Sequence, residues 1–163
     1  MTQKNLLIMG FGGHARSVAD IAIACGYTKL LFVDENARPG EQLMGYEVIK
    51  SLNELDASWC DAFAASGDAR KRQRQCLALE KAGLSLVSLV APSASVGIGS
   101  VIFPGCFIGH QAHIGPMATL GKSSILNTGA MVEHESSVGD YSHISINAAI
   151  AGRSKLGAYS MLG

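Results

Sequence analysis

Residues 106–132 read CFIGHQAHIGPMATLGKSSILNTGAMV, with an aliphatic side chain at every sixth position. This spacing extends without a gap through Val96, Ile102, Ile108, Ile114, Leu120, Leu126, Val132, Val138, Ile144, Ile150, Leu156 and Leu162. Two positions before each of these stands a small residue: Ala94, Ser100, Cys106, Ala112, Ala118, Ser124, Ala130, Ser136, Ser142, Ala148, Ser154 and Ser160. A fixed period of six at two coupled positions predicts an all-β left-handed parallel β-helix built from hexapeptide repeats.

The repeat predicts a triangular coil in which three short strands use eighteen residues. We expect the aliphatic side chains to stack inside the coil and the small residues to lie near its corners. The frequent glycine after the aliphatic residue, and Asn127 at the same place, are expected to relax the backbone where the chain turns. A β-sandwich would instead need turn signals at intervals of about 8–12 residues.

The first ninety residues have a different pattern. A buried strand at 6–9, a glycine-rich turn, a helix at 14–24 and a strand at 30–33 make a Rossmann-like βαβ unit. Further segments are a strand at 62–65, a helix at 70–81 and a last strand of this sheet at 84–90. We therefore predict an α/β domain at residues 1–91 and the β-helix at residues 92–163.

Charge and composition exclude several classes of protein. The formal net charge is zero, which gives no support for nucleic acid or an anionic membrane as a partner. No apolar run is long enough for a membrane span, and residues 6–9 are too short for a signal peptide. The four cysteines are scattered and lack the spacing of a metal site, so free thiols in the cytoplasm are expected.

The glycine turn and the residues after two strands predict a ligand site. Glycines at 10, 12 and 13 allow backbone N–H groups to approach a phosphate at the helix N-terminus. Asp34 and Glu35 follow the second strand, where carboxylates accept hydrogen bonds from a ribose or a base. Gly67 stands in a second turn beside the same crevice. Because the unit is small, a mononucleotide-sized ligand is expected; a merely tight turn is the alternative.

In the repeat region, the pattern changes at Glu133, His134 and Glu135. A carboxylate on one ring nitrogen of histidine fixes the tautomer and raises the basicity of the other nitrogen. His134 is therefore a candidate general base. The alternative is a surface histidine between two solvated carboxylates.

Taken together, these motifs resemble the sugar acetyltransferases with hexapeptide repeats. The resemblance rests on Gly-x-Gly-Gly-His at 10–14, Ser66-Gly67-Asp68, and the order Asn-Thr, His-Glu, Gly-Asp, His-Ile between residues 127 and 144. The relatives are the nucleotide-sugar 4-amino N-acetyltransferases of the bacillosamine and perosamine type, with sialic acid O-acetyltransferases close by. Gly12 and Glu35 depart from the usual Ser and Asp of that pattern.

The resemblance implies roles for particular residues. It implies an α/β domain that binds the nucleotide-linked amino sugar and a β-helix that forms a homotrimer and binds acetyl-CoA between subunits. His134 would be the general base and Glu135 its orienting carboxylate, and His143 would contact acetyl-CoA. The sugar-nucleotide site would contain Gly12, Gly13, His14, Asp34, Glu35 and Gly67.

The implied reaction is transfer of the acetyl group of acetyl-CoA to the 4-amino group of a nucleotide-linked amino-deoxysugar. The family continues for further coils, so we expect this chain to be a C-terminally truncated form. Alternatives are O-acetylation of sialic acid or another sugar, and a non-catalytic nucleotide-sugar-binding protein. A zinc-dependent carbonic anhydrase would need His110, His113 and His134 at one corner, and offsets of 21 and 24 residues do not suit an eighteen-residue coil. No metal is expected.

Overall fold

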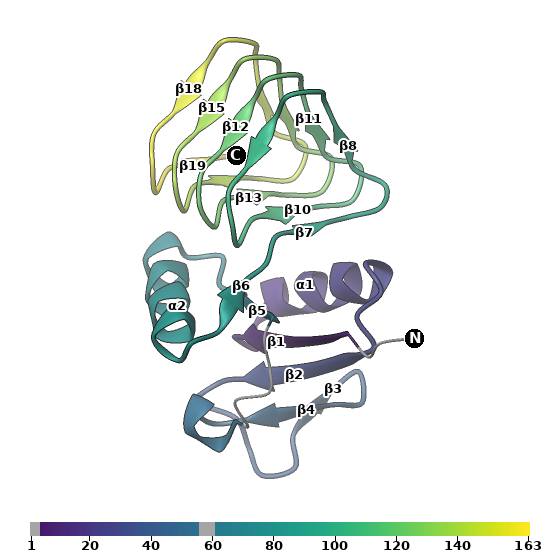
Figure 1. The fold of residues 1–163 in the computed structure, drawn as a ribbon, viewed down its shortest axis with the longest axis vertical. Coiled ribbons are helices and arrows are strands. Elements are labelled where there is room, and N and C mark those ends of the chain that lie inside the picture. Colours follow the sequence, from purple (N-terminus) through teal and green to yellow (C-terminus); the bar gives the residue numbers. More distant parts are fainter. Residues whose placement is uncertain (1–3, 56–60) are drawn as a thin grey trace.

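The computed structural model describes residues 4–55 and 61–163. Figure 1 shows an α/β unit at one end and a triangular β-helix at the other, with helix α1 between the β-helix and the sheet. Among the described residues, no helix is long and apolar enough to cross a membrane. Cys60 lies outside the described residues, and Cys25, Cys76 and Cys106 are free thiols.

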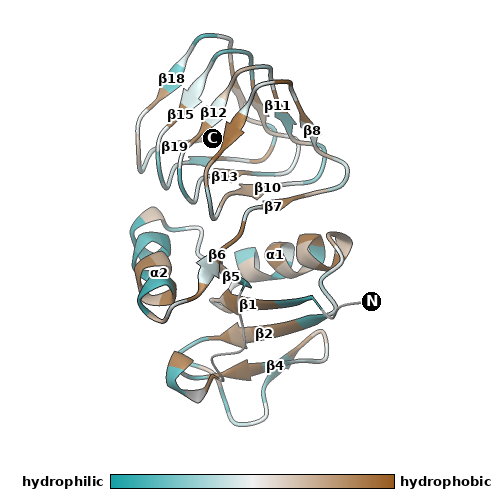
Figure 2. Ribbon diagram, in the orientation of Figure 1, coloured by the Kyte–Doolittle hydropathy of each residue, from teal (hydrophilic) through white to brown (hydrophobic). Residues whose placement is uncertain are grey.

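The α/β unit contains one sheet of six strands in the order β3-β4-β2-β1-β5-β6. All neighbours are parallel except β3 and β4. The strands are β1 (Asn5–Met9), β2 (Lys29–Val33), β3 (Gln42–Leu43), β4 (Tyr46–Ile49), β5 (Asp61–Ala64) and β6 (Ser85–Leu86). Apolar residues colour much of β1 and β2 brown in Figure 2, as expected for strands buried on both faces, whereas β4 includes the exposed Glu47.

Two helices connect these strands. Helix α1 (Gly13–Ala24) packs Ala15, Val18 and Ile21 into the core. Helix α2 (Ala69–Lys81) begins after Asp68, whose carboxylate accepts a hydrogen bond from the backbone N–H of Lys71 at 2.6 Å. This side chain satisfies one of the free N–H groups of the first turn and fixes where the helix begins. A short 3-10 turn, η1 (Leu52–Glu54), follows β4.

The β-helix consists of three parallel sheets with the orders β19-β16-β13-β10-β7, β17-β14-β11-β8 and β18-β15-β12-β9. Paired residues are eighteen positions apart, as in Phe107 with Ile125, so the predicted coil length is confirmed. The strands are β7 (Leu89–Val90), β8 (Ser95–Val96), β9 (Val101–Ile102), β10 (Phe107–Ile108), β11 (His113–Ile114), β12 (Thr119–Leu120), β13 (Ile125–Leu126), β14 (Met131–Val132), β15 (Ser137–Val138), β16 (His143–Ile144), β17 (Ala149–Ile150), β18 (Lys155–Leu156) and β19 (Met161–Leu162).

The aliphatic residues of the repeat fill the interior, and the small residues are buried beside them. Ile108, Ile114, Leu120 and Leu126 are fully buried, and Cys106, Ala112, Ala118 and Ala130 belong to the same cluster. Hydroxyls at this position find backbone acceptors: Ser142 Oγ donates to the carbonyl of Gly157 in the next coil at 2.6 Å, and Ser124 Oγ donates to the carbonyl of Gly121 in its own coil. A polar residue of this size is therefore buried without an unpaired group.

The turn position expected from the sequence is wrong. Left-handed backbone occurs one residue before each small residue from Ser100 onward, at Gly99, Gly105, Gln111, Met117, Ser123, Gly129, Glu135, Tyr141, Asn147, Arg153 and Tyr159. Asn127 and the glycines that follow the aliphatic residue are not in this group. Those glycines allow a close approach instead, because a Cβ at Gly97 would lie 2.5 Å from the backbone nitrogen of Pro116.

The prediction of one continuous strand of the first sheet at residues 84–90 is also wrong. Residues 85–86 form β6, which pairs with β5, whereas residues 89–90 form β7, which pairs with β10 of the β-helix. The chain leaves one sheet and enters the other within this segment. The first solenoid strand thus ends just before the division at residues 91/92, which stays a prediction.

One core joins the two parts of the molecule. Leu89, Phe107 and Ile125 face outward from their β-helix sheet and belong to the same buried cluster as Val18 and Ile21 of α1. Burial of this apolar face holds the α/β unit against one side of the β-helix.

Arg72 of α2 strengthens that contact. Its side chain is fully buried, and its guanidinium donates hydrogen bonds to backbone carbonyls of both parts: Ser123 at 2.8 Å, Ser66 at 2.7 Å, Gly67 at 2.9 Å and Tyr141 at 2.5 Å. Its hydrogen-bond partners among the described residues are carbonyls and no carboxylate. Burial lowers the pKa of Arg72 to about 10. The planar donor set of arginine suits this bridging of carbonyls.

Candidate functional site

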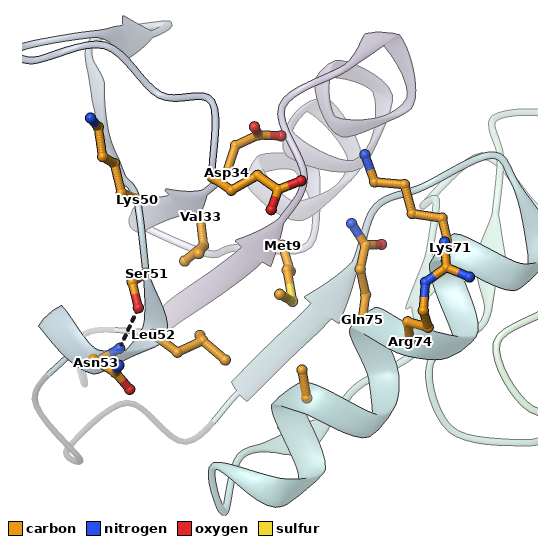
Figure 3. Close-up of a pocket in the computed structure, with 12 residues that line it drawn as sticks. Met9, Val33, Asp34, Lys50, Ser51, Leu52, Asn53, Lys71, Arg74 and Gln75 are labelled. Carbon is orange, nitrogen blue, oxygen red and sulfur yellow. Dashed lines mark hydrogen bonds between the residues drawn. The ribbon is translucent and has the colours of Figure 1, made fainter.

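A cleft of about 780 Å³ lies at the carboxyl ends of β1, β2 and β4, beside α2. Ligands of open parallel sheets bind at this edge. Its lining consists of Met9, Val33, Asp34, Glu35, Lys50, Ser51, Leu52, Asn53, Lys71, Arg74, Gln75 and Ala78 (Figure 3). Two of the predicted ligand-binding residues, Asp34 and Glu35, therefore lie in one cleft.

The loop after β2 holds Asp34 in a defined place. Its backbone N–H donates to the carbonyl of Ile49 at 3.0 Å, which ties the loop to the end of β4. Its Oδ1 accepts a hydrogen bond from the backbone N–H of Asn36 at 2.9 Å. A fixed carboxylate at this position can accept hydrogen bonds from ribose hydroxyls.

The glycine turn lies at the end of β1, outside the lining of the cleft. Gly12 is the N-cap of α1 and Gly13 its first residue, without a side-chain cap. The N–H groups at the start of this helix are therefore free to bind an anion. Gly10, at the start of this turn, has a φ of 119°, a backbone conformation that favours glycine. Gly67 also lies outside the lining, and its carbonyl is bonded to Arg72.

His14 and His143 lie near each other, between the α/β unit and the β-helix. The ring of His14 packs edge-on against Phe107 with centroids 4.7 Å apart, and its Nε2 has no hydrogen-bond partner among the described residues. Burial, then the charges of Arg72 and His143, lower the pKa of His14 to about 4. Burial and the charge of Arg72 lower the pKa of His143, whose Nε2 lies 3.2 Å from Nδ2 of Asn127.

His134 and Glu135 lie at the corner between β14 and β15. Nδ1 of His134 is 3.5 Å from Oε1 of Glu135. Arg153, one coil on, contacts the same carboxylate at 3.2 and 3.3 Å, and its hydrogen bond and charge lower the pKa of Glu135. The carboxylate is thus held ionised beside the imidazole, an arrangement that orients a histidine base.

Gly152 is a residue of this corner that the sequence analysis missed. It stands one coil above His134, and a Cβ at residue 152 would overlap with Nε2 and lie 2.7 Å from Cε1 of the imidazole. The sequence could have indicated this residue, because Gly152 does not directly follow an aliphatic residue of the repeat, where the other glycines are frequent.

The predicted residues therefore fall into three places in one chain. Asp34 and Glu35 line the cleft, His14 and His143 lie at the junction, and His134 lies between β14 and β15. The sheets of β11 and β15 meet at this corner, which lies on the side away from the α/β unit (Figure 1). The other two corners contact that unit: Lys122 pairs with Glu80 of α2, and His110 with Asp20 of α1.

The three histidines of the carbonic anhydrase alternative are dispersed. His110 bonds to Ser93 at the corner before β11, and His113 bonds to Ser95 from β11 itself. Among residues 4–55 and 61–163, no three His, Cys, Asp or Glu side chains form a group able to hold a metal ion.

Both parts of the chain are similar to known proteins. Residues 5–79 match the model of the PglD N-terminal domain. The acetyltransferase domain of PglB from Neisseria gonorrhoeae, solved in complex with acetyl coenzyme A, is 25% identical with a TM-score of 0.86. That alignment covers 98% of this chain and 87% of the other. No curated protein matches the chain significantly in sequence.

Two further structures share the fold at lower identity. PerB from Caulobacter crescentus, in complex with CoA and GDP-perosamine, is 21% identical with a TM-score of 0.59, over 94% of this chain and 91% of its own. WeeI from Acinetobacter baumannii is 14% identical with a TM-score of 0.67, over 96% and 90%.

The fold and these matches define an acyltransferase of the hexapeptide-repeat class. Residues 5–79 are similar to the PglD N-terminal domain, and the chain as a whole is similar to the acetyltransferase domain of PglB.

Proposed function

We propose that the protein transfers the acetyl group of acetyl-CoA to the 4-amino group of a nucleotide-linked amino-deoxysugar. The pairing of His134 with Glu135 carries the proposal, because an oriented imidazole is the base that an attacking amine needs. The cleft with Asp34 and Glu35 supplies a place for the nucleotide, and the start of α1, with Gly12, Gly13 and His14, would lie toward its phosphates and sugar.

The proposed chemistry is direct transfer. The amine nitrogen forms a bond to the thioester carbonyl carbon while His134 accepts the proton from that nitrogen. The carbon–sulfur bond then breaks, and the proton passes to the CoA sulfur. Glu135 keeps the imidazole oriented and stabilises its protonated form. No covalent intermediate on the protein is required.

The distance between the corner of His134 and the cleft supports a homotrimer as the working unit. In one chain these sites lie in different parts of the molecule, because the cleft is lined by the α/β unit and His134 follows β14 of the β-helix. The corner of His134 carries exposed apolar side chains, including Ile98 at 86% and Met117 at 65% exposure. A second copy of the chain would cover this surface and bring its own cleft or His143 close to His134.

The first experiment measures release of free CoA thiol from acetyl-CoA with a panel of nucleotide-linked 4-amino sugars. We expect release with one sugar and its loss in His134→Ala. His113→Ala is the matched control, because His113 is also a partly exposed histidine of the β-helix. Release only with hydroxyl acceptors such as sialic acid would favour O-acetylation. Nucleotide-sugar binding without release would favour a non-catalytic protein.

A mixing experiment tests the shared site. His134→Ala and Asp34→Ala chains, each inactive alone, are co-expressed with different tags and purified as mixed oligomers. If the site is shared, mixed oligomers regain part of the activity, since one interface then holds an intact cleft and an intact His134. Mixed oligomers without activity would contradict the shared site but not the reaction.

A further inference from the structure

The charged and polar residues of the cleft form three groups that follow one another across the strand ends. Lys71, Arg74 and Gln75 of α2 form one wall, and Asp34 and Glu35 stand at the end of β2. Lys50, Ser51 and Asn53 follow β4 on the opposite side (Figure 3). Since β4, β2 and β1 are neighbours in the sheet, this order is also the spatial order. An elongated ligand lying across the strand ends would meet cations, carboxylates and then neutral and cationic donors.

Within residues 4–55 and 61–163, Lys71 and Arg74 of α2 have no anionic partner. The neighbouring Arg72 is fully buried and donates its hydrogen bonds to carbonyls, so it is not available to a ligand. The exposed side chains of Lys71 and Arg74 are available. Two adjacent unpaired cations in a cleft attract a group that carries more than one negative charge.

Gln75 gives an independent indication of a ligand. The residue is only 6% exposed, yet its Oε1 has no hydrogen-bond partner in the part of the chain that the structure describes. Its Nε2 lies beside the glycine turn, 3.2 Å from where a Cβ on Gly10 would be. A buried acceptor without a donor is costly, and a hydroxyl or N–H group of a ligand would satisfy it.

We infer that α2 holds the diphosphate of the nucleotide through Lys71 and Arg74, while Gln75 accepts a hydrogen bond from a hydroxyl of the adjoining sugar. The ribose then lies against Asp34 and Glu35, and the base lies toward β4, where Lys50 and Asn53 donate to its carbonyl oxygens. This inference rests on the proposed function but assigns the diphosphate to α2 as well as to the glycine turn.

Isothermal titration calorimetry tests the assignment. The probes are UDP, dTDP and GDP and their monophosphates, and the proteins are the wild type, Lys71→Ala, Arg74→Ala and the control Lys81→Ala. Lys81 lies on the same helix but outside the cleft. We expect each cleft variant to weaken diphosphate binding about tenfold, with a smaller effect on the monophosphate and a shallower dependence on salt. Lys81→Ala should bind as the wild type does.

Each other outcome overturns the inference. If the two cleft variants bind the diphosphate as tightly as the wild type, α2 does not hold it. If diphosphate and monophosphate lose the same factor, the residues contact the nucleoside instead. If the wild type binds none of the probes and releases no thiol, the proposed function is overturned as well. If both cleft variants keep the kcat and KM of the wild type, only this inference is overturned.

Discussion

The imidazole of His134 lies against Gly152, the residue directly above it in the next coil. There is no room for a side chain at residue 152 while His134 keeps its orientation. Gly152→Ala is therefore expected to displace the ring from Glu135 and to lower kcat about 10- to 100-fold, because a misplaced base loses its geometry. Steady-state kinetics with the thiol assay measures this.

The matched control for that variant is Ala151→Gly, which changes the adjacent residue of the same corner. Its activity should stay close to that of the wild type. Unchanged kcat in Gly152→Ala would show that the orientation of His134 seen here is not the one used in the reaction.

Gln75→Leu should separate binding from stability. The substitution removes the unpaired buried Oε1, and an unsatisfied buried polar atom costs about 1–3 kcal/mol. We expect the free energy of unfolding of the ligand-free protein to be unchanged or higher, while nucleotide binding weakens. Urea denaturation and calorimetry on the same preparation give both quantities. A large loss of stability would mean that Gln75 is a structural residue.

Arg72→Met should destabilise the protein by about 3 kcal/mol or more, because several buried carbonyls lose their donor at once. Arg74→Ala, two residues along the same helix and exposed, is expected to change stability by less than about 0.5 kcal/mol. Chemical denaturation compares the two variants. Equal stabilities would show that the carbonyls find other donors when Arg72 is absent.

His14 should make stability depend on pH in the acid range. Its pKa is about 4 in the folded protein and about 6.5 in an unfolded chain. Between these values the unfolded chain binds a proton that the folded protein does not, so stability falls as the pH is lowered from about 6.5 towards 4. The loss is up to about 3 kcal/mol by linkage.

The measurement is the free energy of unfolding at pH 7 and at pH 5 for the wild type and His14→Asn. The difference between the two pH values should be smaller in the variant. An identical difference would assign the acid sensitivity to other groups, such as His143, whose pKa burial also lowers.

The period of six made most of the β-helix predictable. Each coil repeats the same backbone, so one rule for the inward side chain covers the sequence from Val96 to Leu162. The left-handed turn residue was misplaced because its identity varies from Gly105 to Met117 and Arg153. No side chain marks that position, because the backbone of the coil imposes the conformation.

Single residues with tertiary roles were harder to predict. Arg72 stands in a run of basic residues that resembles an exposed helix face, and only the packing of α2 against the β-helix buries it. The strands β3 and β4 were missed because they are short and mixed in polarity. The roles of His134, Glu135 and His143 remain predictions that the experiments above test.

The eighteen-residue register has a consequence for how this molecule tolerates changes in length. Removal of one whole coil before His134 would keep it at the same corner and only bring it nearer to the start of the solenoid. Removal of a single hexad would preserve every local backbone conformation yet rotate the later residues by a third of a turn, onto another side of the triangle. The side of the triangle on which His134 lies, relative to the cleft of the α/β unit, is thus set by the whole number of hexads between them.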